Sequence, residues 1–282
     1  DQFIWVYFDN PAAPAIVGAP VWDEHYFSVI HFSQTNAEGQ FVDSSGRDNP
    51  ATGQGVVGPL SLGDGASGGG LQLRGGQASF ASILSQNRGV RIPDGVTISL
   101  WAQGVLQDLD TTNSILRVLD TGFELSMTAG GPDAHVRMRL TKQETGEATG
   151  YAAHVTTDDG WHHFAYVQTG DRMGAHFFRD LRSPVPKVLL QPGLTDIRAV
   201  DVGINWIGGI DELHISLVER EPDWVSIQAR SVANELLQFG ERPQPPPLRP
   251  AQGLRVGQPV VLFQFDEAGL LVPNRVPNGE NE

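Results

Sequence analysis

Short segments in which apolar and polar residues alternate follow one another along most of the chain, separated by glycine and proline. Val96–Trp101 (VTISLW) and Gly122–Met127 (GFELSM) are two examples. A period of two residues is typical of a β-strand with one buried face. The same pattern predicts strands at Phe3–Phe8, Phe27–Phe32, Leu71–Leu73, Ile115–Asp120, His135–Thr141, Gly150–Thr156, Trp161–Gln168, Ala175–Arg179 and Glu212–Leu217. So many short strands predict an all-β fold in which two antiparallel sheets pack as a sandwich.

The segment GWHHFAYV, residues 160–167, places two histidines side by side within one predicted strand. Successive side chains of a strand point to opposite faces of the sheet. One face then holds Trp161, His163, Ala165 and Val167, and the other holds His162, Phe164 and Tyr166. Since apolar residues occupy both faces, we expect an inner strand that is covered on both sides. The two histidines diverge, so they do not bind one ion together and are interpreted as structural.

Pro222–Leu237 has apolar residues at helical spacing, which form a stripe of Val225, Ala229, Val232 and Leu236. We expect an amphipathic helix that covers the sandwich. Residues 242–250 (RPQPPPLRP) predict a stiff polyproline linker. The predicted organisation is the sandwich at 21–240, the linker at 241–250, and the start of a further β domain or an added strand at 251–282.

The chain is acidic, with 33 Asp and Glu against 19 Lys and Arg and a formal net charge of −14 over 282 residues. Its basic residues are scattered, so no basic surface is available to neutralise a phosphate backbone, and we expect no nucleic-acid partner. No apolar run of about 18 residues could span a bilayer, so we expect no direct membrane insertion by this segment. The absence of cysteine excludes disulfide bonds and thiolate ligands. DQFIWVYFDN lacks the basic start of a signal peptide, and we expect it to begin a mature or excised piece of a longer protein.

The sequence contains the residue spacings of some enzymatic motifs, but without the secondary structure that those motifs require on either side. GQGVVG (53–58) and GDGASG (63–68) have dinucleotide-binding spacing, and GASGG (65–69) has that of a nucleophile elbow around Ser67. None of them stands between a strand and a helix, as those sites require, so we interpret all three as loops. A zinc motif of the HExxH type is absent from the sequence.

Glycoside hydrolysis needs two carboxyl groups that face each other across a cleft. Glu124 stands alone on its strand, and the neighbours Asp211 and Glu212 are expected to diverge. Asp108 and Asp110 lie in a polar segment typical of a solvated turn. We therefore expect no catalytic activity. The alternative is a carbohydrate-active enzyme, a glycoside hydrolase or lyase, whose acidic pair comes from separate strands.

Five segments in order resemble a known module, across about residues 21–240. They are Trp22–Phe32 (WDEHYFSVIHF), Asp43–Asp48 (DSSGRD), Ile98–Ala102 (ISLWA), GWHHFAYV and Ile207–Ile215 (IGGIDELHI). This order resembles the laminin-G-like, concanavalin A-like module of bacterial envelope proteins. The resemblance implies a jelly-roll sandwich. It implies less about function, because this fold hosts lectins, adhesion modules and enzymes.

The N-terminal Val6–Ala15 (VYFDNPAAPA) resembles the closing strand of a small β domain that often precedes this module. The resemblance implies that residues 1–20 are the closing strand of a preceding β domain. In bacterial proteins that pair occurs upstream of a TolQ/ExbB-type proton channel, in biopolymer transport. The resemblance implies a periplasmic or cell-envelope location and a proton-channel membrane complex as partner.

In this family a calcium ion often lies at the rim, held by the aspartate of the "aspartate, glutamate" strand, by the early aspartate loop and by backbone carbonyls. The matching residues here are Asp211 and Asp43, so the resemblance implies Ca²⁺ as cofactor with these ligands. Ca²⁺ takes about 6–8 oxygen ligands, which carboxylates and loop carbonyls supply. The alternative is that Asp43 forms an Asx turn and Asp211 caps a strand end.

Tryptophan is the remaining candidate for ligand contact, as a platform for sugar stacking. Trp101, Trp161 and Trp224 lie in apolar patterns and are expected in the core. Trp22 and Trp206 lie at the edges of their segments, where the pattern does not decide between core and surface. The prediction from the sequence is a non-catalytic recognition or scaffold module of the bacterial cell envelope, which binds a glycan or a protein partner.

Overall fold

The structure is a computed structural model of the 282-residue chain. It describes residues 2–6, 21–55, 57–59, 64–75, 80–84, 89–104, 113–119, 121, 123–130, 133–141, 148–155, 160–172, 174–180, 193–233, 235, 261–265 and 271–272. The chain divides into two units, one of residues 20–236 and one of residues 1–19 together with 237–282.

The unit made from the two ends of the chain contains a small antiparallel sheet. Strand β1 (Gln2–Val6) pairs with β19 (Val261–Phe265), which also pairs with β20 (Leu271–Val272). The N-terminal and C-terminal segments are therefore partners of one another. Whether they belong to separate domains, as the sequence predicts, stays a prediction, and the linker at 241–250 lies outside the described residues.

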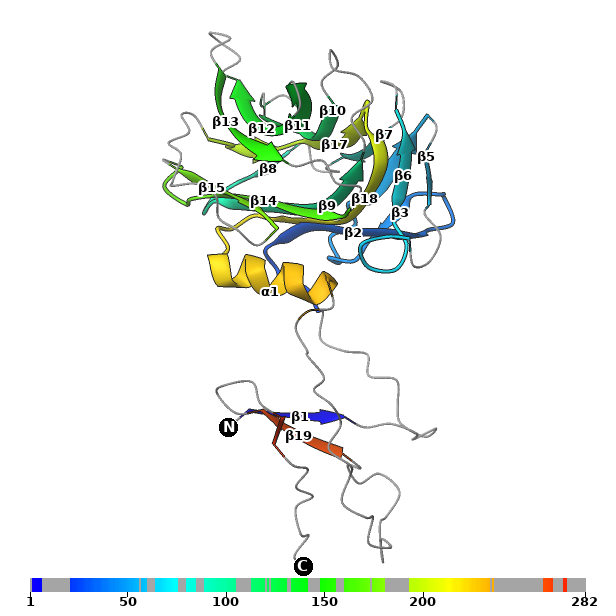
Figure 1. Cartoon of the computed structure of the whole chain (residues 1–282), viewed down its shortest axis with the longest axis vertical. Coiled ribbons are helices and arrows are strands. Elements are labelled where there is room, and N and C mark those ends of the chain that lie inside the picture. Colours follow the sequence, from blue (N-terminus) through cyan, green and yellow to red (C-terminus); the bar gives the residue numbers. More distant parts are fainter. Residues whose placement is uncertain are drawn as a thin grey trace, which may run out of the picture. The chain divides into compact units, whose positions relative to one another are not determined.

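The larger unit is a sandwich of two layers, drawn one above the other in Figure 1. One layer consists of β7 (Phe80–Leu84), β10 (Asn113–Val118), β11 (Phe123–Gly130), β12 (Asp133–Thr141), β13 (Ala148–Val155) and β17 (Ala199–Ile204). The other consists of β2 (Tyr26–Thr35), β9 (Val96–Gly104), β14 (His162–Gln168), β15 (Ala175–Arg179) and β18 (Ile207–Ser216). All pairings between named strands are antiparallel, so the predicted all-β sandwich is confirmed.

Hydrogen bonds connect the two layers at one edge. The strand order runs from β7 through β4 (Ala51–Gln54) and β3 (Phe41–Asp43) to β2, so one curled sheet forms both layers. Strand β6 (Leu71–Arg74) pairs with β18 and with β5 (Val57–Pro59), and β8 (Val90–Arg91) pairs with β16 (Asp196–Ile197). This continuity differs from the two separate sheets that the sequence pattern predicts.

Alternation along each strand fills the space between the layers with apolar side chains. Phe123 of β11 and Tyr166 of β14 meet across it, with ring centroids 4.7 Å apart. The core also contains Phe27, Ile30, Leu100, Ile115, Phe164, Val202, Leu213 and Ile215. Burial of this apolar surface is the main stabilising contribution to the unit.

The strand β14 behaves as its sequence predicts. Phe164 and Tyr166 face the core between the layers, whereas Ala165 and Val167 face the other way. There they pack against Phe178 of β15 and Val225. The strand is therefore buried on both faces.

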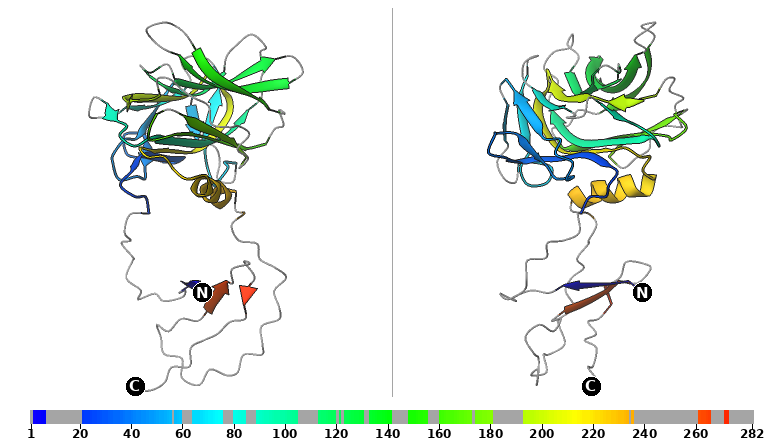
Figure 2. Two further views of the ribbon diagram at one scale, coloured as in Figure 1. Left: turned by 90° about the vertical axis from the view of Figure 1, so that its left-hand side faces the viewer. Right: turned by 180° about the vertical axis from the view of Figure 1, so that it is seen from behind.

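Helix α1 (Pro222–Val232) covers the outer face of the β2–β18–β9–β14–β15 layer, as Figures 1 and 2 show from three sides. It starts at the predicted proline, which suits the first turn, with Asp223 near the N-terminus and Arg230 near the C-terminus. Val225 and Ala229 are buried, so the predicted cover helix is confirmed. It ends at Val232, five residues short of the prediction, and Leu236–Leu237 lie outside the described residues.

The tryptophans differ from expectation. Trp206 is the deeply buried one, 2% exposed, and donates its indole N–H to the carbonyl of Gln103 at 3.2 Å. Trp101, Trp161 and Trp224 are half-buried and lie outside the core. Trp101 is on the outer face of β9, Trp161 directly precedes β14, and Trp224 is on α1.

In the part of the chain that the structure describes, α1 is the only helix, and no helix has the length and apolar content needed to cross a membrane.

Candidate functional site

Strand β18 contains a β-bulge at Glu212. β18 pairs with β9 through Asp211 opposite Trp101 and His214 opposite Ser99, so three steps along β18 match two along β9. Glu212 has a φ of 50°, a left-handed conformation that costs an L-residue about 1–2 kcal/mol. The extra residue brings Asp211 onto the same outer face as Glu212 and His214. The expectation that Asp211 and Glu212 diverge is wrong, because it assumed unbroken alternation.

Asp211 is 0% exposed, and both of its carboxylate oxygens accept backbone N–H groups. Ser67 donates to Oδ2 at 3.0 Å and Glu212 donates to Oδ1 at 2.8 Å. Burial raises the pKa of Asp211 to about 7, and these two N–H groups oppose the rise. A Cβ on Gly65 would lie 2.8 Å from Asp211 Oδ2. The glycine-rich segment 65–69, predicted as a loop, therefore holds the carboxylate of Asp211 with its backbone.

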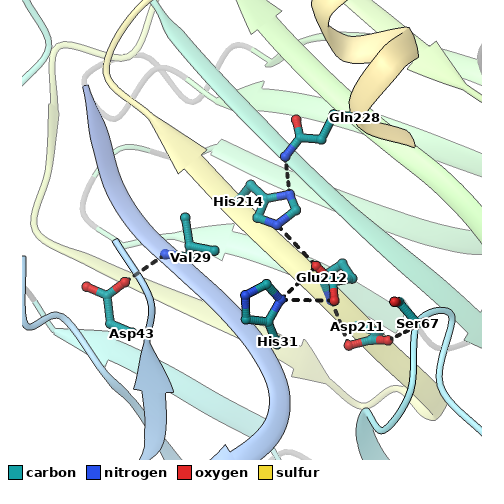
Figure 3. Close-up of polar contacts among 8 residues, drawn as sticks. All are labelled: Val29, His31, Asp43, Ser67, Asp211, Glu212, His214 and Gln228. Carbon is teal, nitrogen blue, oxygen red and sulfur yellow. Dashed lines mark hydrogen bonds and ion pairs between the residues drawn. The ribbon is translucent and has the colours of Figure 1, made fainter. Parts of the chain in front are cut away.

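Glu212 lies between two imidazoles from neighbouring strands, as Figure 3 shows. Both of its carboxylate oxygens are 2.9 Å from His31 Nδ1, and Oε2 is 3.2 Å from His214 Nε2. Burial alone would raise the pKa of Glu212, but the contacts with His214 and His31 outweigh it and lower that pKa to about 2. Glu212 also raises the pKa of His31, whereas burial lowers the pKa of His214. These three residues are named the His31–Glu212–His214 cluster below.

Trp22 and α1 enclose this cluster. The ring centroid of Trp22 lies 5.0 Å from that of His214 and 6.1 Å from that of His31. Gln228 of α1 contacts His214 Nδ1 with its amide nitrogen. The side chains of Glu212 and His214 are 8% and 5% exposed, but that of His31 is 35% exposed. The cluster is therefore buried on the helix side and open to solvent at His31.

Asp43, the second predicted calcium ligand, ends β3 and organises the loop that follows. Its Oδ1 accepts the N–H groups of Val29 and Ser45, each at 2.9 Å, and its Oδ2 accepts that of Asn49 at 2.9 Å. The bond from Ser45 is an Asx turn, one of the two alternatives that the sequence left open. Figure 3 shows Asp43 against Val29, whereas Asp211 contacts Ser67.

The structure does not gather Asp43 and Asp211 into one ligand group. Among the described residues, one set of three or more His, Asp or Glu side chains has all of its ligand atoms within 4.8 Å of one another, and it is the His31–Glu212–His214 cluster. Calcium binding at Asp211 and Asp43 stays a prediction.

The adjacent histidines of β14 separate as predicted. His162 Nδ1 lies 2.9 Å from Asp180 Oδ2. His163 is 2% exposed and packs against Trp101, with ring centroids 5.4 Å apart. Burial lowers the pKa of His163 to about 3, and its Nδ1 has no hydrogen-bond partner in the described part of the chain. His163 is thus a neutral packing residue.

The sequence pattern did not identify His31, Glu212 and His214 as a group. His31 and Glu212 are 181 residues apart, so no local spacing links them. The available signal was Glu212 and His214 at positions i and i+2 of one predicted strand, which places both side chains on one face. Their partner His31 lies beside them because β2 pairs with β18 in the sheet.

Solved structures with this fold include several toxin binding domains. The binding domain of botulinum neurotoxin DC in complex with rat synaptotagmin II matches with TM-score 0.58 and 12% identity, over 74% of this chain and 52% of that one. A structure of botulinum neurotoxin type C, described as interacting with two ganglioside molecules, matches with TM-score 0.56 and 12% identity, over 74% and 51%. The binding domain of Paraclostridial Mosquitocidal Protein 1 matches with TM-score 0.59 and 12% identity, over 91% and 69%.

These similarities concern the fold. The chain spans about half the length of the botulinum neurotoxin chains it matches. No protein-family model and no curated protein sequence matches it. The β-rich architecture is therefore shared, and a shared fold does not by itself imply a shared activity.

Proposed function

We propose that this chain is a non-catalytic recognition module that binds a glycan or a protein partner. The observation that carries the proposal is the fold that this chain shares with toxin binding domains. Among those proteins, one was solved with rat synaptotagmin II, one interacts with two gangliosides and one was solved with SialylT. Such a sandwich presents its ligand site on a rigid scaffold, which suits recognition.

The acidic residues support a role without catalysis. Asp211 and Glu212 are 0% and 6% exposed, and neighbouring groups engage both carboxylates. A glycosidase needs two carboxyl groups that reach a sugar across a cleft. Neither residue reaches solvent in that way. Asp108 and Asp110, the other pair considered from the sequence, lie outside the described residues.

A glycan array that includes gangliosides and sialylated oligosaccharides tests this proposal, with mass spectrometry of each bound glycan after incubation. The expected result is binding to a restricted set of glycans, which are recovered intact. Glu212→Gln serves as the matched variant for catalysis. Cleavage by the wild type that this variant abolishes would establish the glycoside hydrolase or lyase alternative, and a blank array would leave only the protein partner.

The proposal extends to a periplasmic or cell-envelope location and to association with a TolQ/ExbB-type proton channel. It rests on the resemblance of Val6–Ala15 and of the laminin-G-like segments to envelope proteins, and residues 7–20 lie outside the described part. Purification of the full-length protein from bacterial membranes tests it. Recovery together with the channel subunits is expected, and recovery as a lone monomer would contradict it.

Calcium at Asp211 and Asp43 is a separate part of the proposal, carried by the same resemblance. Titration of chelator-treated protein with Ca²⁺ in a calorimeter tests it, with Asp43→Asn and Asp211→Asn as variants. Binding heat and a raised melting temperature, both lost in these variants, are expected. The absence of heat together with an unchanged melting temperature would remove the two residues as ligands.

A further inference from the structure

We propose that the His31–Glu212–His214 cluster is a binding site for a divalent transition-metal ion of the zinc type. The ion would be held by Nδ1 of His31, the carboxylate of Glu212 and Nε2 of His214. This site is distinct from the predicted calcium ligands Asp211 and Asp43, and it differs from them in donor chemistry.

The donor atoms have the composition that such an ion requires, and all of them lie within 4.8 Å of one another. A tetrahedral zinc ion with ligands at about 2.0–2.1 Å separates those ligands from one another by about 3.3 Å. The structure places Glu212 oxygens 2.9 Å from His31 Nδ1 and 3.2 Å from His214 Nε2. Small adjustments of the side chains therefore admit the ion. Two imidazoles and one carboxylate favour zinc, cobalt, nickel or copper over calcium, which prefers oxygen ligands alone.

His214 Nε2 is a buried nitrogen aimed at this position without a hydrogen-bond partner of its own. It is 3.2 Å from Glu212 Oε2, but this contact lacks the geometry of a hydrogen bond, and no other partner exists in the described part of the chain. A buried imidazole nitrogen is normally satisfied. An ion between His214 and Glu212 would satisfy it.

Gln228 supplies the outer contact that orients a metal-binding histidine. Its side-chain amide touches His214 Nδ1. A half-turn of the amide brings its oxygen to this position, where it accepts the Nδ1–H and directs the lone pair of Nε2 toward Glu212. Ligand histidines in proteins are regularly held by such a second hydrogen bond, which fixes tautomer and ring orientation.

Two of the six non-glycine residues with a positive φ in the described part of the chain lie at this cluster. Glu212 has a φ of 50° and Phe32, the residue after His31, has a φ of 54°. Both residues belong to strands, where bulky side chains rarely adopt this conformation. Strain of this kind accumulates at ligand sites, because the surrounding structure must hold the ligands in one geometry.

The half-exposed side chain of His31 provides a route for the ion and for a solvent molecule. His31 lies on β2, whereas Glu212 and His214 lie on β18 and Gln228 on α1. The ion would thus connect two strands directly and the helix through Gln228. An ion that binds the folded state and not the unfolded chain stabilises the folded state.

The test uses the untagged full chain after treatment with a chelator. Zn²⁺ titration in a calorimeter measures affinity and stoichiometry, and Co²⁺ reports the coordination through its visible absorption. The expected result is one ion per chain and a raised melting temperature. His31→Ala and Glu212→Gln should each weaken binding by more than about tenfold. His25→Ala, which removes an exposed histidine close to β2, is the matched control and should bind as the wild type does.

Absence of Zn²⁺ and Co²⁺ binding by the wild type would overturn the proposal. Equal binding by the wild type and His31→Ala would also overturn it, because the ion would then lie elsewhere. Near-ultraviolet circular dichroism checks that each variant is folded. If Glu212→Gln does not fold, His31→Ala decides, since its side chain is half-exposed. Stronger binding of Ca²⁺ than of Zn²⁺ at these residues would refute the assignment to a transition metal.

Discussion

At the scale of single residues, backbone conformation decides how the acidic groups of β18 act. The left-handed φ of Glu212 lets Asp211 turn toward the glycine-rich loop while Glu212 turns toward His31. Two neighbouring carboxylates therefore have opposite environments. Burial raises the pKa of Asp211 to about 7, and the histidines lower the pKa of Glu212 to about 2.

Gly65 is the residue on which the loop around Asp211 depends. A Cβ at this position would lie 2.5 Å from the carbonyl oxygen of Gly69 and 2.8 Å from Asp211 Oδ2. Gly65→Ala should therefore lower the free energy of unfolding by about 1–3 kcal/mol, as overpacking does. Urea denaturation measures this change.

Gly170→Ala is the control for Gly65→Ala. Among the described residues other than its two chain neighbours, the atom nearest to its Cβ would be the carbonyl oxygen of Asp94, at 3.4 Å. A loss of stability in Gly170→Ala equal to that in Gly65→Ala would show that glycine replacement as such, and not the clash near Asp211, is responsible.

His163 should make the protein sensitive to acid. Burial lowers its pKa from an ordinary value of 6.5 to about 3. Between these two pH values the unfolded chain binds a proton that the folded protein excludes. The free energy of unfolding therefore falls by up to about 1.4 kcal/mol for each unit by which the pH is lowered. Above pH 6.5 the residue is neutral in both states and contributes no pH dependence.

Thermal unfolding of the wild type and His163→Gln at several pH values between 3 and 8 measures this contribution. The loss of stability with acid should be shallower in the variant. The exposed His25, replaced in His25→Gln, should leave the wild-type slope unchanged. If stability falls with acid at the same rate in His163→Gln and in the wild type, folding does not prevent the protonation of His163.

At the scale of secondary-structure elements, helix α1 closes the outer face of one layer. Its contact with the sheet passes through Val225, which is 1% exposed and packs with Ala165, Val167 and Phe178. Ala229 is buried as well, whereas Ile227 is 57% exposed. The helix is thus attached through a narrow apolar stripe, together with Gln228 at His214.

Val225→Ala should reduce the free energy of unfolding by about 2 kcal/mol, because it removes buried methyl groups and leaves a cavity. Ile227→Ala removes a side chain of similar type from the exposed face and should change stability by less than about 0.5 kcal/mol. Guanidinium denaturation of both variants tests the assignment. Equal effects would mean that the helix does not pack through Val225.

At the scale of the whole molecule, the two units should be separable. All pairings of the strands in residues 20–236 lie within that segment, and β1 pairs with β19 in a sheet of its own. Residues 20–236 also contain the described hydrophobic core. A protein of these residues should therefore fold alone, because its core is complete.

Differential scanning calorimetry of residues 20–236 and of the full chain measures this independence. A single cooperative transition is expected for the shorter protein, at a melting temperature within a few degrees of the main transition of the full chain. Non-cooperative unfolding, or aggregation of residues 20–236 under conditions in which the full chain stays folded, would contradict the division.

The sequence by itself determined the local features of this protein. Alternating residues define strands such as β14, and Val225 and Ala229 define the buried side of α1, because both periods follow from backbone geometry alone. The bulge at Glu212, the loop of Gly65 around Asp211 and the joining of the layers through β3 and β4 were decided by the tertiary structure. They depend on pairing between distant segments, and no local period encodes such pairing. For that reason the cluster of His31, Glu212 and His214 became visible only in the folded chain.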